Sequence, residues 1–554
     1  MSGELAIHHL GGGLGLGPNA FGRDVANLAL YRAFARHGGF ERLHMLTSVE
    51  TDAGSMATAL AGASPLTTVV EAGALLDLGR ARRAGTLFRG KADLAEMAWA
   101  RRGLLNDSAY SLVGLIHTIA PPLTREEIAQ ASLAPVHPWD AIICTSPSVH
   151  ASIKTMFEDW TDYLGERFGG PRRPMPHLPV LPLGVELDEI TALADRPDVR
   201  RQTRERLGLA EDDVLALWVG RLSFFEKAAP QPMFRAVEEA GHLAGRPLHF
   251  ALVGWFARES DRGHFEAAAR GYAPSAIIHW IDGNDADQLG QMWAASDIFL
   301  SLVDNIQETF GLAPVEAMAA GLPIVASDWD GYRFTIRHGQ EGFLAPTLTP
   351  SAGPPSEALL RRHLARIDTY QSYVGQAAQY TAVDVGAAAR GLAELACSPE
   401  LRARMGAAGR QRVRETFDWR QVIPGYRVLF DELAEIRRSA PAAEPGPRLN
   451  PLHSDPFVDH RSFATATAGP DLHLSVRAGV DLARDPALTS AVELDSFGEA
   501  WRAPRPELAE LAARIAESPE TRLGDLVGAF PPERRARITY GLLWLCKIGV
   551  LDWR

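Results

Sequence analysis

The chain has 554 residues, of which 46% are apolar and 22% charged, and its formal net charge is −12. This composition is typical of a globular protein, and the length exceeds what one hydrophobic core organises, so we expect about three domains. The negative charge disfavours a general affinity for nucleic acid.

The compartment is predicted from the cysteines and from the absence of apolar runs. Only Cys144, Cys397 and Cys546 occur, too few for a disulfide framework or a cysteine metal site, which fits a reducing compartment. Residues 1–4 lack the basic start of a secretory signal, and no window holds about 18 uncharged apolar residues. We therefore expect a cytoplasmic protein whose membrane contact, if any, is peripheral at the inner face.

Two blocks of the chain alternate short apolar strands with amphipathic helices. The first covers residues 1–188 and opens with a strand at 5–10, a glycine loop and a helix at 20–36. The second covers residues 189–438, with strands near 214–219, 248–253, 277–281, 298–302 and 324–326. This alternation predicts parallel sheets covered on both faces, so we expect an α/β protein with two Rossmann-like domains in tandem, facing a cleft.

The first glycine loop and two later strand ends carry candidate groups. Gly15-x-Gly17-x-x-Ala20 fits a dinucleotide fingerprint, but the second strand runs on without the acid that would hold a ribose, which disfavours an NAD site. His117 ends a strand at the same edge, although a lone histidine is more often structural. Thr145 and Ser146 end another strand and are predicted to line an acceptor cleft.

Residues 80–102 are rich in basic side chains, interrupted by leucines, Phe88 and Trp99. The favoured interpretation is a solvated helix and loop surface. The alternative is a patch for an anionic acceptor or a membrane surface.

A cationic pair follows the first strand of the second block. Arg221 and Lys227 would lie at the carboxyl edge of the sheet, where open α/β sheets bind ligands. A departing diphosphate gains negative charge, which preplaced cations stabilise. Without the preceding strand, such a pair would more often be solvated.

Two glutamates eight residues apart give the strongest indication of function. Glu308 precedes, and Glu316 lies on, a helix predicted from about Pro314 to Ala320. The start of a helix presents unpaired N–H groups and the positive end of a dipole, which suit a phosphate, and Gly311 allows close approach. The two carboxylates would accept hydrogen bonds from sugar hydroxyls on either side.

This run resembles the donor-binding signature of the family 4 glycosyltransferases, retaining enzymes of the GT-B fold. The resemblance implies that Glu308 lies beside the transferred sugar, that Glu316 binds the nucleotide ribose, and that the intervening amides hold the diphosphate. The further donor-site residues that it implies are Gly12, Gly13, His117, Arg221, Lys227, Gly254, Asp282, Thr309, Phe310, Gly311 and Leu312.

Three departures from the family pattern are visible. Ala228 follows the lysine where a glycine is usual, Leu183 replaces an asparagine in the segment that closes the first domain, and Phe334 stands where an acid is usual. The last substitution puts in doubt any contact made by that acid.

The resemblance predicts a retaining transferase that moves a sugar from a nucleotide-diphosphate sugar to an acceptor hydroxyl on a polysaccharide, a lipid-linked glycan or a protein. A GT-B epimerase or hydrolase, and a non-enzymatic regulator that binds sugar nucleotides, are the alternatives. Two Asp-x-Asp runs, at 285–287 and 328–330, are not placed as a metal-dependent transferase fold requires. Because Arg221 and Lys227 can neutralise the diphosphate, we predict no metal and no cofactor.

The end of the chain lies outside the resemblance. Residues 439–450 have the composition of a linker, and residues 451–554, with a net charge of −3, form an extra domain. Residues 523–530 and 534–546 read as helices and 549–553 as a strand, weakly resembling a winged-helix unit. Its charge disfavours nucleic-acid binding, and a protein-docking or dimerisation role is the alternative.

Overall fold

The computed structural model describes residues 3–11, 13–62, 64–170, 175–351, 353–441, 446–489, 492–518 and 521–554. The chain divides into two compact units, Met1–Asn450 and Pro451–Arg554. No described helix combines the length and the apolar character needed to cross a bilayer.

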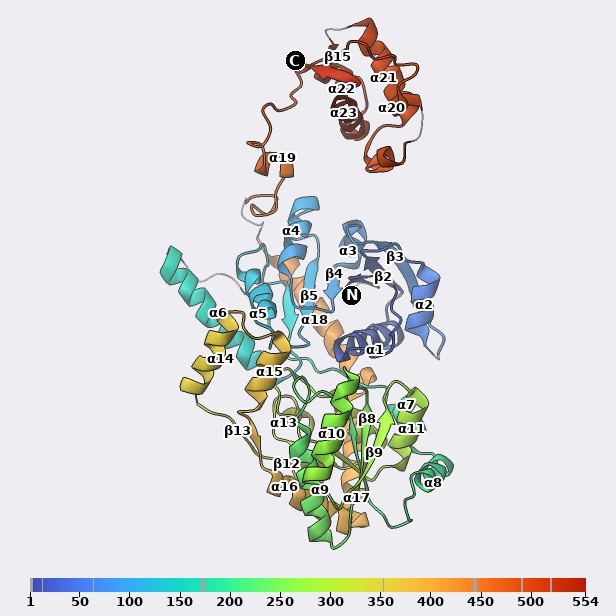
Figure 1. Cartoon of the computed structure of the whole chain (residues 1–554), viewed down its shortest axis with the longest axis vertical. Helices are drawn as coiled ribbons and strands as arrows, with labels where there is room; N and C mark the ends of the chain where they lie inside the picture. Colours follow the sequence, from blue (N-terminus) through green and yellow to red (C-terminus); the bar gives the residue numbers. More distant parts are fainter. Residues whose placement is uncertain are drawn as a thin grey trace. The chain divides into compact units, whose positions relative to one another are not determined.

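The first sheet, coloured in blue shades in Figure 1, has six parallel strands in the order β3-β2-β1-β4-β5-β6. Its strands are β1 (Glu4–His9), β2 (Arg42–Thr47), β3 (Val69–Ala74), β4 (Thr86–Arg89), β5 (Ser111–Leu115) and β6 (Ala141–Ile143). The helices around it are α1 (Gly22–His37), α2 (Ala53–Ala61), α3 (Leu78–Ala84), α4 (Ala95–Leu104), α5 (Pro122–Ala129), η1 (Gln130–Ser132) and α6 (Pro147–Phe168). Every residue of β4, β5 and β6 is buried, as expected of a sheet covered on both faces.

The second sheet, also parallel, has the order β12-β11-β10-β7-β8-β9. Its strands are β7 (Leu215–Val219), β8 (His249–Gly254), β9 (Ile277–Asp282), β10 (Ile298–Ser301), β11 (Ile324–Ser327) and β12 (Gly342–Ala345), and a small antiparallel pair is β13 (Thr347–Leu348) with β14 (Ala382–Val383). The helices are α7 (Leu187–Ala194), α8 (Pro197–Arg206), α9 (Pro230–Ala244), α10 (Glu259–Tyr272), α11 (Ala286–Ala295), α12 (Leu312–Ala320), α13 (Tyr332–Thr335), α14 (Pro354–Leu364), α15 (Tyr370–Ala378), α16 (Val385–Cys397), α17 (Pro399–Arg412), η2 (Val413–Phe417) and α18 (Trp419–Ser439).

Both sheets have the same topology. Counted from its own first strand, each has the order 3-2-1-4-5-6, so the predicted α/β class with two Rossmann-like domains in tandem, the GT-B arrangement, is confirmed. In such sheets the crossover direction reverses between strands 1 and 4, which opens a crevice at their carboxyl ends. That position falls between β1 and β4 in the first domain and between β7 and β10 in the second.

The chain passes between the two domains at two places that lie side by side. The Val185 N–H donates to the Phe417 carbonyl at 2.8 Å, and the Trp419 N–H donates to the Val185 carbonyl at 3.1 Å. A Cβ on Gly184 would lie 2.7 Å from the buried Trp419 ring. From here α18 returns along the first domain and packs against α1 and β5 (Figure 1). The two crossings thus form one hydrogen-bonded connection.

The unit of residues 451–554 has its own small core. Its elements are α19 (Pro456–Asp459), β15 (His473–Val476), α20 (Pro486–Thr489), η3 (Glu493–Ser496), η4 (Glu499–Trp501), α21 (Arg505–Glu517), β16 (Thr521–Arg522), α22 (Leu523–Gly528), α23 (Pro532–Lys547) and β17 (Leu551–Trp553). Strand β15 pairs antiparallel with both β16 and β17, and α21 packs against α23. This unit is mainly helical, as expected, and the winged-helix resemblance stays a prediction.

Candidate functional site

The loop that carries the first glutamate leads into α12. This helix begins at Leu312 rather than near Pro314 as predicted, and Pro314 is tolerated because the first turn has no intrahelical partners for its N–H groups. Gly311 caps the helix with φ +89°, and a Cβ there would lie 2.1 Å from the Tyr332 ring. Both its conformation and its space therefore require glycine.

Glu308 and Lys227 form an ion pair between two loops of the second domain. The Lys227 Nζ lies 2.6 Å from Glu308 Oε2, and the Thr309 N–H donates to Glu308 Oε1 at 3.3 Å. Burial alone would raise the pKa of Glu308, but the Lys227 ammonium and the amides of Thr309 and Phe310 hold this pKa below its ordinary value. The carboxylate is therefore ionised at neutral pH.

Glu316, on the first turns of α12, has a different environment. Its side chain is half-buried, and no hydrogen bond or ion pair joins it to any part of the chain that the structure describes. Burial raises the pKa of Glu316 to about 6, and the nearby Lys227 charge partly opposes this rise. Such a carboxylate retains its capacity to accept hydrogen bonds from a ligand.

Arg221 lies where the two domains meet. Its guanidinium donates to Glu226 Oε2 at 2.8 Å and stacks over the rings of Phe21 and Trp255, at 5.3 and 6.0 Å from their centroids. Phe21 precedes α1 in the first domain, whereas Trp255 follows β8 in the second. The cation thus faces the interdomain crevice, and its orientation is fixed by an acid and two rings.

His117 is held by a network of the first domain. Its Nε2 lies 2.8 Å from Asn27 Oδ1, and Asn27 Nδ2 donates to the Gly90 carbonyl at 3.1 Å. Burial, and then the charge of Arg23, lower the pKa of His117 to about 4, so the imidazole is neutral at physiological pH. It can therefore exchange a hydrogen bond with a ligand without adding charge.

The loop that carries Glu308, between β10 and α12, contacts the first domain directly. The Thr309 hydroxyl donates to the His117 carbonyl at 2.8 Å, and the Thr145 hydroxyl lies 3.5 Å from the Thr309 carbonyl. Next to this contact, the Ser146 hydroxyl donates to Asp330 Oδ1 at 3.0 Å. These contacts bring His117 and Thr145 beside Glu308.

The remaining predicted glycines differ in their roles. Gly12 lies outside the described residues. Gly13 is exposed, and its carbonyl lies 3.3 Å from His9 Nε2. Gly254 is buried at the end of β8, where a Cβ would lie 1.9 Å from the Gly220 carbonyl oxygen. Gly254 is thus required for close contact between neighbouring strand ends.

The other predicted residues of the site are placed as follows. Asp282 ends β9, and its carboxylate accepts hydrogen bonds from the N–H and the side-chain amide of Asn284 at 3.0 and 3.1 Å. Phe310 is buried with its ring 6.0 Å from that of Phe417, and Leu312 is the first residue of α12. Phe310 and Leu312 can therefore contribute backbone amides, while the ring of Phe310 belongs to the core.

Asn284 joins the domains as well. The Asn19 N–H donates to Asn284 Oδ1 at 2.8 Å, and Asn284 Nδ2 donates to Asn19 Oδ1 at 3.1 Å. Asn19 has a φ of +60°, a conformation that asparagine adopts more readily than most residues. Sequence reasoning missed this pair, although the asparagine in a glycine loop was a signal for such a turn.

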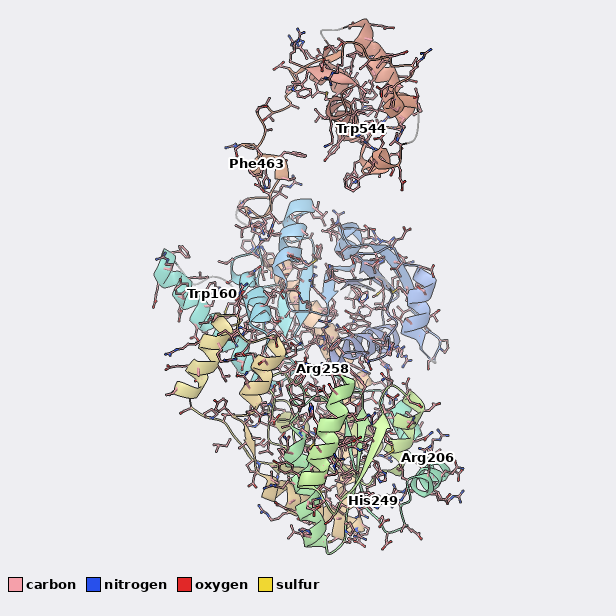
Figure 2. The ribbon with its side chains drawn as sticks, in the orientation of Figure 1. Trp160, Arg206, His249, Arg258, Phe463 and Trp544 are labelled. Atoms are coloured by element: carbon pink, nitrogen blue, oxygen red, sulfur yellow. The ribbon has the colours of Figure 1, made fainter. Side chains whose placement is uncertain are left out.

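Two further groups at the site were also missed. Tyr370, at the start of α15, donates its hydroxyl to Gln307, the neighbour of Glu308. Arg258 caps α10 on the side of the second domain that faces the first (Figure 2), with its guanidinium 5.5 Å from the Phe225 centroid. Neither residue belongs to a recognisable motif, so only folding reveals its position.

The basic segment 80–102 differs from both interpretations of the sequence. Arg101 is fully buried and makes two charged hydrogen bonds to Asp140, at 2.7 and 2.8 Å. The cations of Arg80, Arg89, Lys91 and Arg102 are likewise bound to nearby acids, namely Glu71, Asp77, Asp93, Asp107 and Glu127. Most of this charge is therefore neutralised within the fold, and Arg101 is a core residue.

Neither Asp-x-Asp run assembles a metal site. Asp285 caps α11 by accepting from two backbone amides, and Asp328 is bound to Arg333 at 3.1 Å. Within the described ranges, no three His, Cys, Asp or Glu side chains are grouped so that they could hold a metal ion. Independence of metal stays a prediction.

Comparisons with known proteins match the second domain most clearly. Residues 199–352 match the family model described as glycosyl transferases group 1, and this range contains Arg221, Lys227, Glu308 and Glu316. A D-inositol 3-phosphate glycosyltransferase of Geodermatophilus obscurus is 31% identical over 207 residues, which are 35% of this chain and 42% of the relative. One of Acidothermus cellulolyticus is 30% identical over 252 residues, 43% of this chain and 52% of the relative.

Solved structures resemble this chain over a longer range than the curated relatives do, but at lower sequence identity. Sucrose-phosphate synthase from Thermosynechococcus elongatus has 18% identity and a TM-score of 0.48, and the match covers 78% of this chain and 98% of that one. The match spans 42% of the length of the Geodermatophilus protein and 52% of the length of the Acidothermus protein, so this chain covers about half of these relatives or less. This chain therefore resembles group 1 glycosyltransferases through residues 199–352.

Proposed function

We propose that the chain is a retaining glycosyltransferase that moves a sugar from a nucleotide-diphosphate sugar to an acceptor hydroxyl. The observation that carries this proposal is the Lys227–Glu308 ion pair of 2.6 Å at the entrance to α12. It places a cation and an ionised carboxylate beside the free N–H groups of a helix start, which together suit a pyrophosphate joined to a sugar. The family match over residues 199–352 supports the same reaction class.

Each group has a defined task in this proposal. Lys227, Arg221 and the amides that follow Gly311 bind the diphosphate and stabilise the charge that develops as the sugar bond breaks. Glu316 accepts hydrogen bonds from the ribose. Glu308 and the neutral imidazole of His117 orient the sugar, and the acceptor hydroxyl attacks from the face that the diphosphate leaves, so the anomeric configuration is retained.

Closure of the two domains excludes water from the donor. The contacts of Thr309 with His117, and of Asn19 with Asn284, join the domains on either side of the crevice. Exclusion of water would suppress hydrolysis of the donor sugar. The hydrogen-bonded connection at Val185 and Trp419 is the natural hinge.

The proposal names classes of acceptor and a cellular compartment rather than one acceptor molecule. The relatives are D-inositol 3-phosphate glycosyltransferases, so an inositol phosphate belongs in an acceptor panel alongside glycans, lipid-linked glycans and proteins. All three cysteines are free thiols, which supports work in the reducing cytoplasm, with any membrane contact peripheral at the inner face.

The test is turnover of a panel of nucleotide sugars, chosen first by thermal stabilisation of the protein. We expect transfer in the wild type and its loss in Glu308→Gln and Lys227→Ala, with the anomeric configuration of the product read by NMR. Lys154→Ala is the matched control, because Lys154 forms an exposed ion pair with Glu158 on α6. Turnover without an acceptor would indicate a hydrolase or epimerase, and stabilisation without turnover a binding regulator.

A further inference from the structure

A cavity of about 1280 Å³ lies between the two domains beside the proposed donor site. Its lining includes the half-buried Ile306, Trp329 and Asp330, which we call the inner end, and Ile306 is two residues from Glu308. Small-molecule pockets commonly hold about 300 to 1,000 Å³, so this cavity exceeds what a monosaccharide or an inositol phosphate would fill.

The outer wall of the cavity is made by a segment beyond the family match. The match ends at residue 352, and α14 and α15 follow directly. Helix α15 packs closely on the loop of the cationic pair, because a Cβ on Gly375 would lie 2.6 Å from the Phe225 side chain. The Tyr370 hydroxyl of the same helix donates a hydrogen bond to Gln307, so this wall contacts the loop that carries Glu308.

The inner end of the cavity is polar and aromatic. Asp330 accepts a hydrogen bond from Ser146 at 3.0 Å, and the Trp329 indole N–H donates to the Asn305 carbonyl at 3.0 Å. Both side chains are half-buried and line the cavity, as does Tyr370. A carboxyl group beside aromatic rings suits a hydroxylated ring, whose hydroxyls donate hydrogen bonds and whose apolar face contacts an aromatic side chain.

The mouth is apolar on both walls. Leu123 on α5 is 64% exposed, and Leu360 and Leu364 on α14 are 53% and 71% exposed. Leu360 and Leu364 are four residues apart and therefore lie on one face of the helix. Three exposed leucines that face one cavity from two domains are an apolar binding surface.

Charge at the mouth does not favour an ionic ligand. Arg333 is bound to Asp328 at 3.1 Å, and Asp368 is bound to Arg362 at 2.8 Å. The remaining ionisable residues of the lining are Arg125 and Arg366 against Glu126 and Asp330, two of each sign. Apolar contact rather than net charge therefore selects what enters.

We infer that this cavity is the acceptor site and that the acceptor is an amphiphile, with a hydroxylated head near Asp330 and Trp329 and an apolar group on the leucines of α5 and α14. This inference rests on the proposed transferase function for the assignment of the ligand as an acceptor. Binding of such an amphiphile can be measured without turnover.

The probes are n-octyl β-D-glucopyranoside and methyl β-D-glucopyranoside, titrated calorimetrically into the full chain below the micelle concentration. We expect the octyl glycoside to bind at least roughly tenfold more tightly, since each methylene removed from water contributes about fourfold. The variant Leu360→Ser/Leu364→Ser should bring the two affinities within about twofold of each other. Leu243→Ser, which removes a 61% exposed leucine on α9 outside the cavity, should leave the difference intact.

Equal affinity of the two glycosides in the wild type would overturn the inference. An octyl preference that survives the α14 variant would place the binding elsewhere, which overturns it as well. Thermal stabilisation by nucleotide sugars, measured on the same proteins, separates the two proposals. Octyl-selective binding without any nucleotide-sugar binding would retain the cavity and reject the transferase, whereas the reverse result would reject the amphiphile alone.

Discussion

The hydroxyl of Thr309 donates a hydrogen bond of 2.8 Å to the main-chain carbonyl of His117, a residue 192 positions earlier in the sequence. This bond joins the loop between β10 and α12, in the second domain, to the end of strand β5 in the first domain. It brings the backbone of His117 into contact with Thr309, the residue that follows the ionised Glu308. The catalytic arrangement that we propose therefore depends on how the two domains meet.

Thr309→Val should weaken this junction. The substitution keeps the shape of the side chain and removes the donor to the His117 carbonyl, so we expect a loss of about 1 kcal/mol in the free energy of unfolding. Urea denaturation measures it. Thr58→Val, which removes an exposed hydroxyl bonded only to the local Gly54 carbonyl, is the control and should change stability by less. Equal effects of the two substitutions would argue against the junction.

Lys227→Ala should remove the cation that faces both glutamates. We expect kcat/KM to fall by about 10²- to 10³-fold, because a preplaced group that stabilises developing charge contributes on this scale. The pKa of Glu308 should also rise, since burial would no longer be opposed by the ammonium. A variant that retains more than half of the wild-type kcat/KM would contradict the role given to Lys227.

Gly311→Ala should be strongly destabilising for two separable reasons. The positive φ costs a residue with a side chain about 1 to 2 kcal/mol, and the added Cβ would meet the Tyr332 ring. Gly339→Ala is a matched control, because Gly339 has φ +78° and no atom within 4 Å of an added Cβ. We expect Gly311→Ala to lower the free energy of unfolding well beyond the control, as measured in urea.

Asp330→Asn should change how stability depends on pH. Burial, followed by the charge of Glu308, raises the pKa of Asp330 from 3.8 to about 7. Between these values the folded protein holds a proton that the unfolded chain has released, so this group makes stability fall as pH rises from about 4 to 7. The asparagine variant lacks this contribution and should gain stability relative to the wild type between pH 4 and pH 8. Urea denaturation of the variant and the wild type at pH 4 and pH 8 measures this gain. A difference in the free energy of unfolding that is the same at both pH values would contradict the raised pKa of Asp330.

Asn284→Ala and Asn19→Ala should open the crevice to different extents. Asn284→Ala removes both hydrogen bonds that join the two loops, whereas Asn19→Ala leaves the backbone N–H of residue 19 in place. We expect the KM for the donor to rise in both, and more in Asn284→Ala. Asn106→Ala, on an exposed turn of the first domain, is the control. A larger effect of Asn19→Ala would contradict this order.

Local patterns predicted much of the framework. Alternating apolar strands and amphipathic helices indicated two parallel sheets, because a strand buried on both faces must be apolar throughout. Glu308 and Lys227 could be named because each follows a buried strand and because their run resembles a known signature. The start of α12 was predicted two residues late, since proline is favoured at the first helical position but stands here at the third.

Contacts between distant segments could not be predicted in the same way. The sequence predicts that Arg101 is a surface cation. In the structure its side chain is buried in the core and paired with Asp140, and the buried charge is stable only because that partner is present. Tyr370 lies in a segment without a motif, and Asp330 was read only as part of an Asp-x-Asp run. Their positions follow from the packing of α15 and from the contact of Ser146 with Asp330.

The sequence by itself determined the two Rossmann-like domains, because periodicity acts over a few neighbouring residues. Its resemblance to a known signature supplied candidates for a diphosphate site, which stay a prediction. Only the tertiary structure decided which of these residues face one another and that α14 and α15 enclose a cavity beside Glu308. The physical reason is that hydrogen bonds and ion pairs act over a few ångströms, and folding alone brings residue 227 to residue 308 and residue 117 to residue 309.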